Sequence, residues 1–125
     1  MRQPCAAPNG FGPERRIRRR PEFQRVFDSG IRAHGRLLTM VAAPNTLGSA
    51  RLGIVASRKL GNAVRRNRAK RLIREIFRRT VPRAGGPALD IVVIPRRELF
   101  DAASSTLETD FRSALRRCTG KLPRP

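Results

Sequence analysis

The chain has 125 residues, of which 28 are Lys or Arg and 9 are Asp or Glu, for a formal net charge of +19. This length predicts one domain with a modest core. The charge predicts a polyanionic partner, since self-repulsion otherwise opposes a compact fold. No apolar run approaches the roughly 18 residues of a membrane-spanning helix, and the N-terminus lacks the apolar run of a secretory signal. We therefore expect a cytoplasmic protein.

The side chains that usually carry chemistry are few. Cys5 and Cys118 have no Cys or His nearby at metal-ligand spacing, which predicts neither a zinc site nor a disulfide. The single histidine, His34, lacks a carboxylate or Cys partner, so a structural or surface role is favoured. Ser104 and Ser105 fit a helix cap better than a nucleophile, and no phosphate-binding Gly-rich loop occurs. The chain therefore reads as a binding protein without catalytic side chains.

The N-terminal part predicts a tail and then a helix. Residues 1–13, rich in Pro and Gly, predict a flexible tail. A basic cluster, ERRIRRR, follows, and Pro21 then suits the first turn of a short helix closed by Gly30. Phe23 and Phe27 fall on one face of this helix. They could both belong to the core, or one of them could face a groove and stack on bases.

Three stretches predict strands. Residues 31–43 are apolar and strand-like, and a Pro-Asn and Gly-Ser turn separates them from a second run at 51–57. One side of that second run carries the slim residues Gly53, Val55 and Ser57. It could face a ligand backbone or a tightly packed helix. Residues 89–94, LDIVVI, are almost continuously apolar, which is typical of a strand covered on both faces and here ended by Pro95.

The most basic segment, residues 58–79, predicts an amphipathic helix over residues 63–80, with Asn62 as its N-cap and a sharp turn at Gly61. At about 100° per residue, an apolar stripe contains Ala69, Leu72, Ile73, Ile76 and Phe77. The opposite side contains Asn67, Arg71, Arg74 and Arg78, flanked by Arg68, Lys70 and Arg79. One face can be buried while the other binds a polyanion. A membrane-surface helix would need bulky apolar residues on a free face, so nucleic acid is favoured.

The remaining elements complete an α+β pattern. The helix at 63–80 joins two strands of one sheet, so those strands could lie parallel. A loop is expected at 83–87. Ser105 with Glu108 resembles a capping box for a last helix that ends at Gly120 and has the stripe Leu107, Phe111, Leu115 and Cys118. The order predicts a two-layer sandwich. The sequence has neither a helix-turn-helix pattern nor the aromatic strand motifs of the RNA recognition motif. Its composition therefore indicates a protein that binds RNA or DNA mainly through the shape and the phosphates of the nucleic acid.

One motif is more specific. Residues 58–75, RKLGNAVRRNRAKRLIRE, closely resemble the RNR signature of the bacterial ribonuclease P protein subunit. The match covers Gly-Asn-Ala-Val, Arg-Asn-Arg and Lys-Arg-Leu-Ile-Arg in the spacing of that family. Residues 20–27 with Gly30 resemble the family's first helix, and residues 52–57 its strand before the motif. The likeness covers about residues 14–117.

This resemblance implies a fold and a function. The fold is an αβββαβα sandwich, ribosomal protein S5 domain 2-like, with a left-handed β-α-β crossover, a connection that is normally disfavoured. We expect a single RNA-binding domain over residues 14–119 and a flexible C-terminal tail at 120–125. The family's members bind a catalytic RNA and together remove the 5′ leader of precursor tRNA. The RNA carries the endonuclease chemistry and the Mg²⁺ ions, so no cofactor is expected on the protein alone.

The resemblance also implies site residues. Contacts with the catalytic RNA are expected from Arg58, Lys59, Asn62, Arg65, Arg66, Asn67, Arg68, Lys70, Arg71 and Arg74. Phe23 and Phe27 match the aromatics that line the leader cleft of the family. The strand segment at 38–41 lacks an aromatic that many members offer to that cleft. Leader binding is therefore expected to depend more on Phe23, Phe27 and phosphate contacts.

Two other functions fit the composition. A structural RNA-binding protein of ribosomal type, with no role in cleavage, would have the same charge and fold. A protein that compacts DNA without sequence preference would also need dense cations. The nature of the RNA that accompanies the purified protein, and competition between structured RNA and duplex DNA, discriminate among these alternatives.

Overall fold

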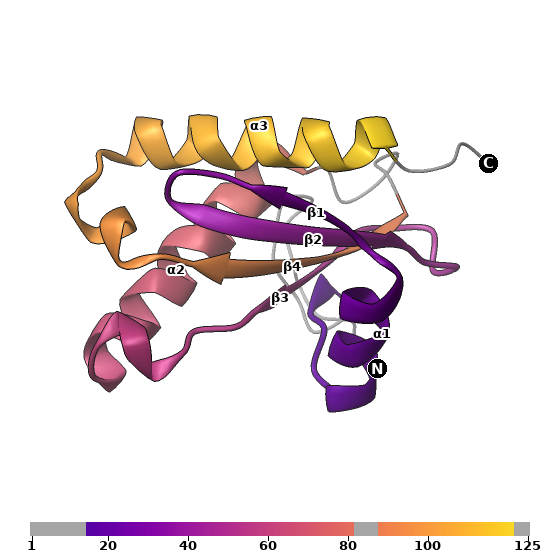
Figure 1. Cartoon of the computed structure of the whole chain (residues 1–125), viewed down its shortest axis with the longest axis horizontal. Helices are drawn as coiled ribbons and strands as arrows, with labels where there is room; N and C mark the ends of the chain where they lie inside the picture. Colours follow the sequence, from indigo (N-terminus) through magenta and orange to yellow (C-terminus); the bar gives the residue numbers. More distant parts are fainter. Residues whose placement is uncertain (1–14, 82–87, 122–125) are drawn as a thin grey trace, which may run out of the picture.

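The computed structural model describes residues 15–81 and 88–121 (Figure 1). The expected N-terminal tail, the loop at 83–87, Cys5 and the last four residues lie outside the described ranges. In chain order the elements are α1 (Arg20–Ser29), β1 (Ile31–His34), β2 (Leu38–Pro44), β3 (Arg51–Ile54), the 3₁₀ helix η2 (Arg58–Leu60), α2 (Ala63–Thr80), β4 (Leu89–Pro95), the 3₁₀ helix η3 (Arg97–Asp101) and α3 (Ser104–Lys121).

The four strands form one mixed sheet in the order β1-β2-β4-β3. The pairs β1–β2 and β2–β4 are antiparallel, and β3 and β4 are parallel. The two parallel strands are joined by α2, as the sequence predicted. Helices α2 and α3 lie along one face of the sheet, while α1 lies against the other face at one end (Figure 1). The predicted α+β sandwich is confirmed.

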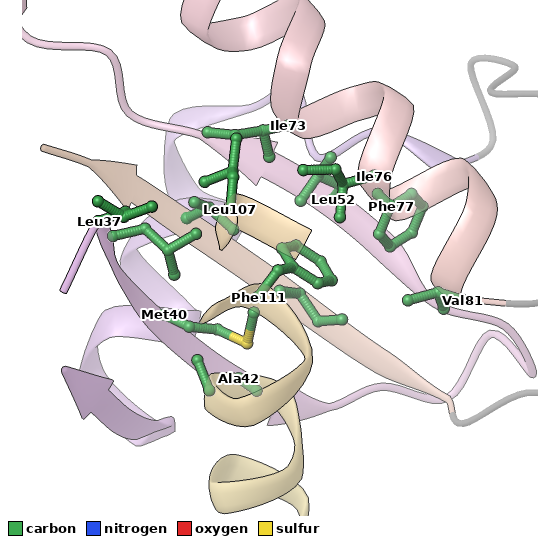
Figure 2. Packing of buried hydrophobic residues seen from close by; sticks show 14 of the residues in the cluster. Leu37, Met40, Ala42, Leu52, Ile73, Ile76, Phe77, Val81, Leu107 and Phe111 are labelled. Atoms are coloured by element: carbon green, nitrogen blue, oxygen red, sulfur yellow. The ribbon is translucent and has the colours of Figure 1, made fainter. Parts of the chain in front are cut away.

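Helix α2 follows its prediction closely. The Asn62 side chain accepts a hydrogen bond of 3.0 Å from the Arg65 backbone N–H and so caps the helix. Gly61 has φ of +125°, which L side chains rarely adopt. On the apolar stripe, Leu72 is half-buried and the other four residues are buried: Ala69, Ile73, Ile76 and Phe77. Figure 2 shows three of them, Ile73, Ile76 and Phe77, pointing from α2 into the core that the sheet and α3 share.

The core has two parts because the sheet is covered on both faces at its centre. Under α2 and α3, a large cluster includes Ile91 and also Met40, Leu52 and Phe111, which Figure 2 labels. Under α1, a smaller cluster consists of Ile17, Val26, Val41, Ala43 and Val92. Along β4 the side chains alternate between the two clusters, which is why its sequence is continuously apolar.

The predicted strand at 31–43 is two strands. Chain reversal occurs at residues 35–37, where Asp110 of α3 accepts hydrogen bonds from the backbone N–H groups of Arg36, at 3.2 Å, and Leu37, at 2.9 Å. A Cβ at Gly35 would lie 2.5 Å from an Asp110 carboxylate oxygen. The turn therefore depends on Gly35 and on Asp110, which is 75 positions further along the chain. The alternation of apolar and polar residues along a strand does not reveal such a turn.

The ends of α3 differ from the prediction. The helix begins at Ser104, and the Leu107 backbone N–H donates to the Ala103 carbonyl at 3.1 Å. Ser105 is therefore inside the helix, and Glu108 pairs with Arg79 at 3.1 Å and Arg112 at 3.0 Å instead of forming a capping box. The helix also continues through Gly120 to Lys121. Cys118 is buried as predicted, with its thiol 3.4 Å from the Ile31 carbonyl oxygen.

Candidate nucleic-acid interface

The cations of α2 and the preceding loop form one exposed surface, which we call the α2 basic surface. Its members are the ten residues that the RNR motif indicates. Of these, Arg58, Lys59, Asn62, Arg65, Asn67, Arg68 and Arg71 are exposed, and Arg66, Lys70 and Arg74 are half-buried. The single acid of α2, Glu75, pairs with Arg78. Among the described residues, no carboxylate forms an ion pair with Arg68 or Arg71, so their charge is left for a partner.

Arg65 and Arg66 of this surface also make contacts within the protein. The Arg66 side chain donates a hydrogen bond of 3.0 Å to the Gly61 carbonyl oxygen. The Arg65 guanidinium lies over the Phe100 ring of η3, 4.6 Å from the ring centroid. A Cβ at Gly61 would lie 2.7 Å from the Arg65 side chain. These contacts hold the loop that carries Arg58 and Lys59 against the start of α2.

Arg16 joins the α2 basic surface from another part of the chain. Residue 16 forms a parallel bridge with Leu52, which places it at the edge of the sheet beside β3. Its side chain lines a hollow together with Asn67, Arg71 and Arg74. Burial and the nearby positive charge of Arg16 lower the pKa of Arg74, although a guanidinium stays charged in proteins. Crowding of like charges here would be relieved by a bound phosphate.

A cleft lies between α1 and the end of β3. It has a volume of about 510 Å³ and is lined by Arg18, Arg20, Phe23, Gln24, Phe27, Ile54 and Val55. Phe23 and Phe27 are half-buried, so each packs against the sheet and still reaches the cleft. Each ring therefore contributes to the core and also faces a groove, while stacking on bases stays a prediction. Arginine side chains beside aromatic rings make a surface suited to single-stranded nucleic acid.

Gly53 explains how closely α1 approaches the sheet. A Cβ there would lie 2.6 Å from the Phe23 ring and 3.1 Å from Ile17. The slim side of β3 therefore packs against α1, which is the helix alternative of the sequence prediction. The glycine also sets the depth of the Phe23 ring beside the cleft.

A buried ionic network ties α1 to the sheet. Asp90 of β4 has a fully buried side chain that accepts hydrogen bonds from Arg25, Asn45 and Arg51, the last at 2.8 Å. Arg51 also pairs with Glu22 of α1 at 3.3 Å. Burial by itself raises the pKa of Asp90, but the hydrogen bonds from Arg51 and Asn45 and the charge of Arg51 outweigh it and hold that pKa below its usual value. The network fixes the helix that forms one wall of the cleft.

The α2 basic surface and the cleft meet. A further hollow is lined by Phe23 of the cleft, by Lys70 and Arg74 of the α2 basic surface, and by Arg16 and Arg18. The two groups of residues that the RNR resemblance indicates as separate sites are therefore adjacent. Arg58 and Lys59 lie at the other end of this surface, in η2 before the start of α2.

Sequence reasoning missed the parts played by the basic cluster at 14–20 and by Asp90. Arg16, Arg18 and Arg20 line the hollows described above. Arg15 is different, because it is fully buried, donates to the Val81 carbonyl oxygen at 2.9 Å and lies over the Phe77 ring. Ile17, the one apolar residue of ERRIRRR and buried in the structure, was a usable signal that this cluster packs against the core. Asp90 stood out as the one acid in an apolar run.

Residues 15–81 and 88–121 contain no group of three or more His, Cys, Asp or Glu side chains that could hold a metal ion. None of the described helices is long and apolar enough to cross a membrane.

Comparison with known proteins identifies similar chains. The family model described as Ribonuclease P matches residues 11–119. A "Ribonuclease P protein component" from Dehalococcoides mccartyi is 42% identical over 93 residues, covering 74% of this chain and 75% of that protein. The protein of the same name from Thermotoga maritima is 41% identical over 94 residues, covering 73% and 77%.

Solved structures agree with the sequence comparisons. The structure of the RNase P protein from Thermotoga maritima has a TM-score of 0.71 and 36% identity, covering 82% of this chain and 96% of that one. A mutant of the Staphylococcus aureus RNase P protein has a TM-score of 0.76 and 33% identity, covering 85% and 89%.

Proposed function

The chain belongs to the ribonuclease P protein family, and on that premise we propose how it serves tRNA processing. The α2 basic surface binds the catalytic RNA subunit of the ribonucleoprotein. The cleft beside Phe23 and Phe27 binds the single-stranded 5′ leader of precursor tRNA. Together they hold the substrate against the RNA subunit during endonucleolytic removal of the leader.

The observation that carries this proposal is the junction of the two surfaces. Lys70 and Arg74 line the same hollow as Phe23, so a strand leaving the cleft passes directly onto cations of α2. Phosphate contacts supply affinity and orientation without reading sequence. Aromatic faces hold unstacked bases of any identity. A protein with both features side by side is suited to hold a substrate strand next to a folded RNA.

The chemistry itself is assigned to the RNA subunit. With a formal net charge of +19, the protein surface repels free divalent cations, whereas RNA phosphates attract them. Mg²⁺ bound by the RNA would supply the activated water and stabilise the leaving oxygen. The protein side chains neutralise phosphate repulsion between substrate and RNA subunit, and this lowers the Mg²⁺ concentration needed for productive binding.

Reconstitution tests the proposal. We expect the protein alone to leave precursor tRNA intact, and its addition to the cognate catalytic RNA to lower the Mg²⁺ concentration that gives half-maximal leader removal. The control is the same RNA with no protein. An unchanged Mg²⁺ requirement would instead favour a purely structural RNA-binding protein. Cleavage by the protein without RNA would contradict the assignment of the chemistry.

Arg68 tests the α2 basic surface. It is exposed, and Arg68→Ala removes one cation without disturbing the buried stripe. We expect weaker binding to the catalytic RNA and a salt dependence, in log–log form, that is shallower by about one. The matched control is Arg97→Ala on the exposed side of η3, which is expected to leave the slope unchanged. Equal slopes for Arg68→Ala and the unmodified protein would exclude Arg68 from the interface.

A further inference from the structure

Helix α3 and strand β1 meet at the edge of the sheet that lies opposite β3. The strand order places β1 at one edge and β3 at the other. Helix α3 packs on β1 and β2, and its residues Leu107, Phe111, Ala114 and Cys118 are buried there. Figure 1 shows α3 along the top of the molecule, with β1 beneath it. One side of α3 is therefore directed outward over the β1 edge.

The residues on this side of α3 form a stripe, because they recur every three or four positions along a helix of 3.6 residues per turn. They are Thr106, Asp110, Ser113, Arg117 and Lys121. The direction of the stripe is fixed by Arg117, whose guanidinium donates to the carbonyl oxygen of the exposed His34 at 3.1 Å. It extends about 22 Å at 1.5 Å per residue. We call the stripe together with Arg36, in the turn after β1, the α3–β1 surface.

The α3–β1 surface has a positive charge that the protein does not neutralise. Arg36, Arg117 and Lys121 are exposed. Among the residues that the structure describes, no carboxylate forms an ion pair with any of these three. Asp110 is half-buried, and its two oxygens accept from the backbone N–H groups of Arg36 and Leu37. The Asp110 charge is therefore held by the turn, and the three cations are left for a partner.

A hollow rich in hydroxyl groups lies beside these cations. It has a volume of about 340 Å³, and its lining includes Arg36, Leu37, Ser105, Thr106, Thr109 and Ser113. Thr109 donates its hydroxyl hydrogen to the Ser105 carbonyl oxygen at 2.9 Å, and its oxygen can still accept. The hollow thus brings an arginine and several hydroxyl groups together on one outward surface.

This combination fits double-helical RNA. An A-form duplex displays 2′-hydroxyl groups and phosphates across a wide, shallow minor groove, and proteins recognise it by these groups and by its shape. Arginine and lysine bind phosphates, and a serine or threonine hydroxyl can donate to or accept from a 2′-hydroxyl group. The α3–β1 surface contains no aromatic side chain on which unpaired bases could stack. A duplex is therefore favoured over a single strand.

We propose that the α3–β1 surface binds a double-helical segment of the catalytic RNA, with its cations on phosphates and its hydroxyls on 2′-hydroxyl groups. The inference rests on the proposed function, in which the same RNA binds the α2 basic surface. Helices α2 and α3 lie on one face of the sheet and are joined by the Arg79–Glu108 ion pair, so one folded RNA can extend over both. The cleft beside Phe23 and Phe27 is on the other face, away from α3.

The test uses the full chain bound to its cognate catalytic RNA. Arg36→Gln and Arg117→Gln each remove one charge, and a glutamine at 117 keeps an N–H donor for the His34 carbonyl. The matched control, Arg112→Gln, removes an exposed charge from the same helix on the side of Glu108. Affinity is measured against salt concentration. Hydroxyl-radical protection maps the RNA backbone in the presence of precursor tRNA, and melting temperatures verify that each variant is folded.

The double variant Arg36→Gln/Arg117→Gln is expected to bind the catalytic RNA roughly ten- to thirtyfold more weakly at about 0.15 M salt, with a log–log salt slope shallower by about two. A base-paired segment of that RNA should lose protection on both strands, while the protections that depend on Arg68 remain. Arg112→Gln should resemble the unmodified protein. Ser113→Ala should weaken binding without changing the salt slope, because it removes a hydroxyl contact and no charge.

An unchanged affinity, salt slope and protection pattern in the double variant overturns the proposal. Loss of protection confined to unpaired nucleotides, or to precursor tRNA, overturns it as well. Arg68→Ala on the same RNA separates the two levels. If Arg68→Ala weakens binding and the double variant does not, the α2 basic surface stands and only the α3–β1 assignment is lost. If neither weakens binding, the proposed contact between α2 and the catalytic RNA fails too.

Discussion

Asp90→Ala is expected to lower the free energy of unfolding by about 3–5 kcal/mol, because it removes one partner of a buried ionic network. The Asp90 side chain is fully buried, and Arg51, which it pairs with, is 14% exposed. Without the carboxylate, the Arg51 charge and the Asn45 amide lose their acceptor in the interior. Chemical denaturation of the purified protein measures the loss.

Two comparisons make this prediction sharp. Glu75→Ala breaks the exposed ion pair with Arg78 and is expected to change the free energy of unfolding little.

The pKa of Asp90 is lowered in the folded state. Its contribution to stability is therefore complete above its unfolded pKa of about 3.9 and is lost as pH falls through the lower folded value. Below about pH 4, Asp90→Asn should therefore lose stability less steeply than the unmodified protein. A stability loss below 1 kcal/mol for Asp90→Ala would contradict the role of the network.

Phe23→Ala is expected to weaken binding of precursor tRNA by about 1–3 kcal/mol, which is the usual contribution of one base stacked on an aromatic ring. Phe23 lines both the cleft and the hollow shared with Lys70, so the ring lies on the path that we propose for the leader. The affinity of the holoenzyme for precursor tRNA is compared with its affinity for mature tRNA. The change should appear with the precursor alone, and the affinity of the protein for the catalytic RNA should stay nearly the same.

Phe23 also packs on Gly53 and on the buried cluster that contains Ile17, so its removal carries a risk of unfolding. Phe23→Leu keeps most of that apolar contact and removes the aromatic face. If the ring stacks on a base, Phe23→Leu should lose leader affinity while its melting temperature stays close to that of the unmodified protein. If leader affinity follows the melting temperature across both variants, Phe23 acts through packing only.

The features that were predicted most accurately from the sequence are those that depend on residues close together in the chain. The bounds of α2, its Asn62 cap and its buried stripe depend on residues within one or two turns of each other. The strand at 89–94 was recognisable because both of its faces are buried. The ends of α3 were less predictable. Ser105 and Glu108 have cap-forming side chains, but Glu108 pairs with Arg79, a residue of another helix.

The candidate site shows the same contrast between features set by neighbouring residues and features set by distant ones. The motif at 58–75 was sufficient to indicate which cations of α2 face outward, because a helix displays its sequence on a regular cylinder. It could not indicate Arg16, which reaches the same surface through a bridge to Leu52. Nor could it show that Arg15, in the same basic cluster, is buried against Phe77.

By itself, then, the sequence determined the charge, the amphipathic helix that presents it and the family to which the chain belongs. Only the tertiary structure decided which of these charges are buried and that the α2 basic surface adjoins the Phe23 cleft. The physical reason is separation along the chain: Arg25 and Asp90 are 65 positions apart, and Arg96 and Thr39 are 57 apart. Such pairs are brought together by strand register and helix packing, which no local pattern encodes.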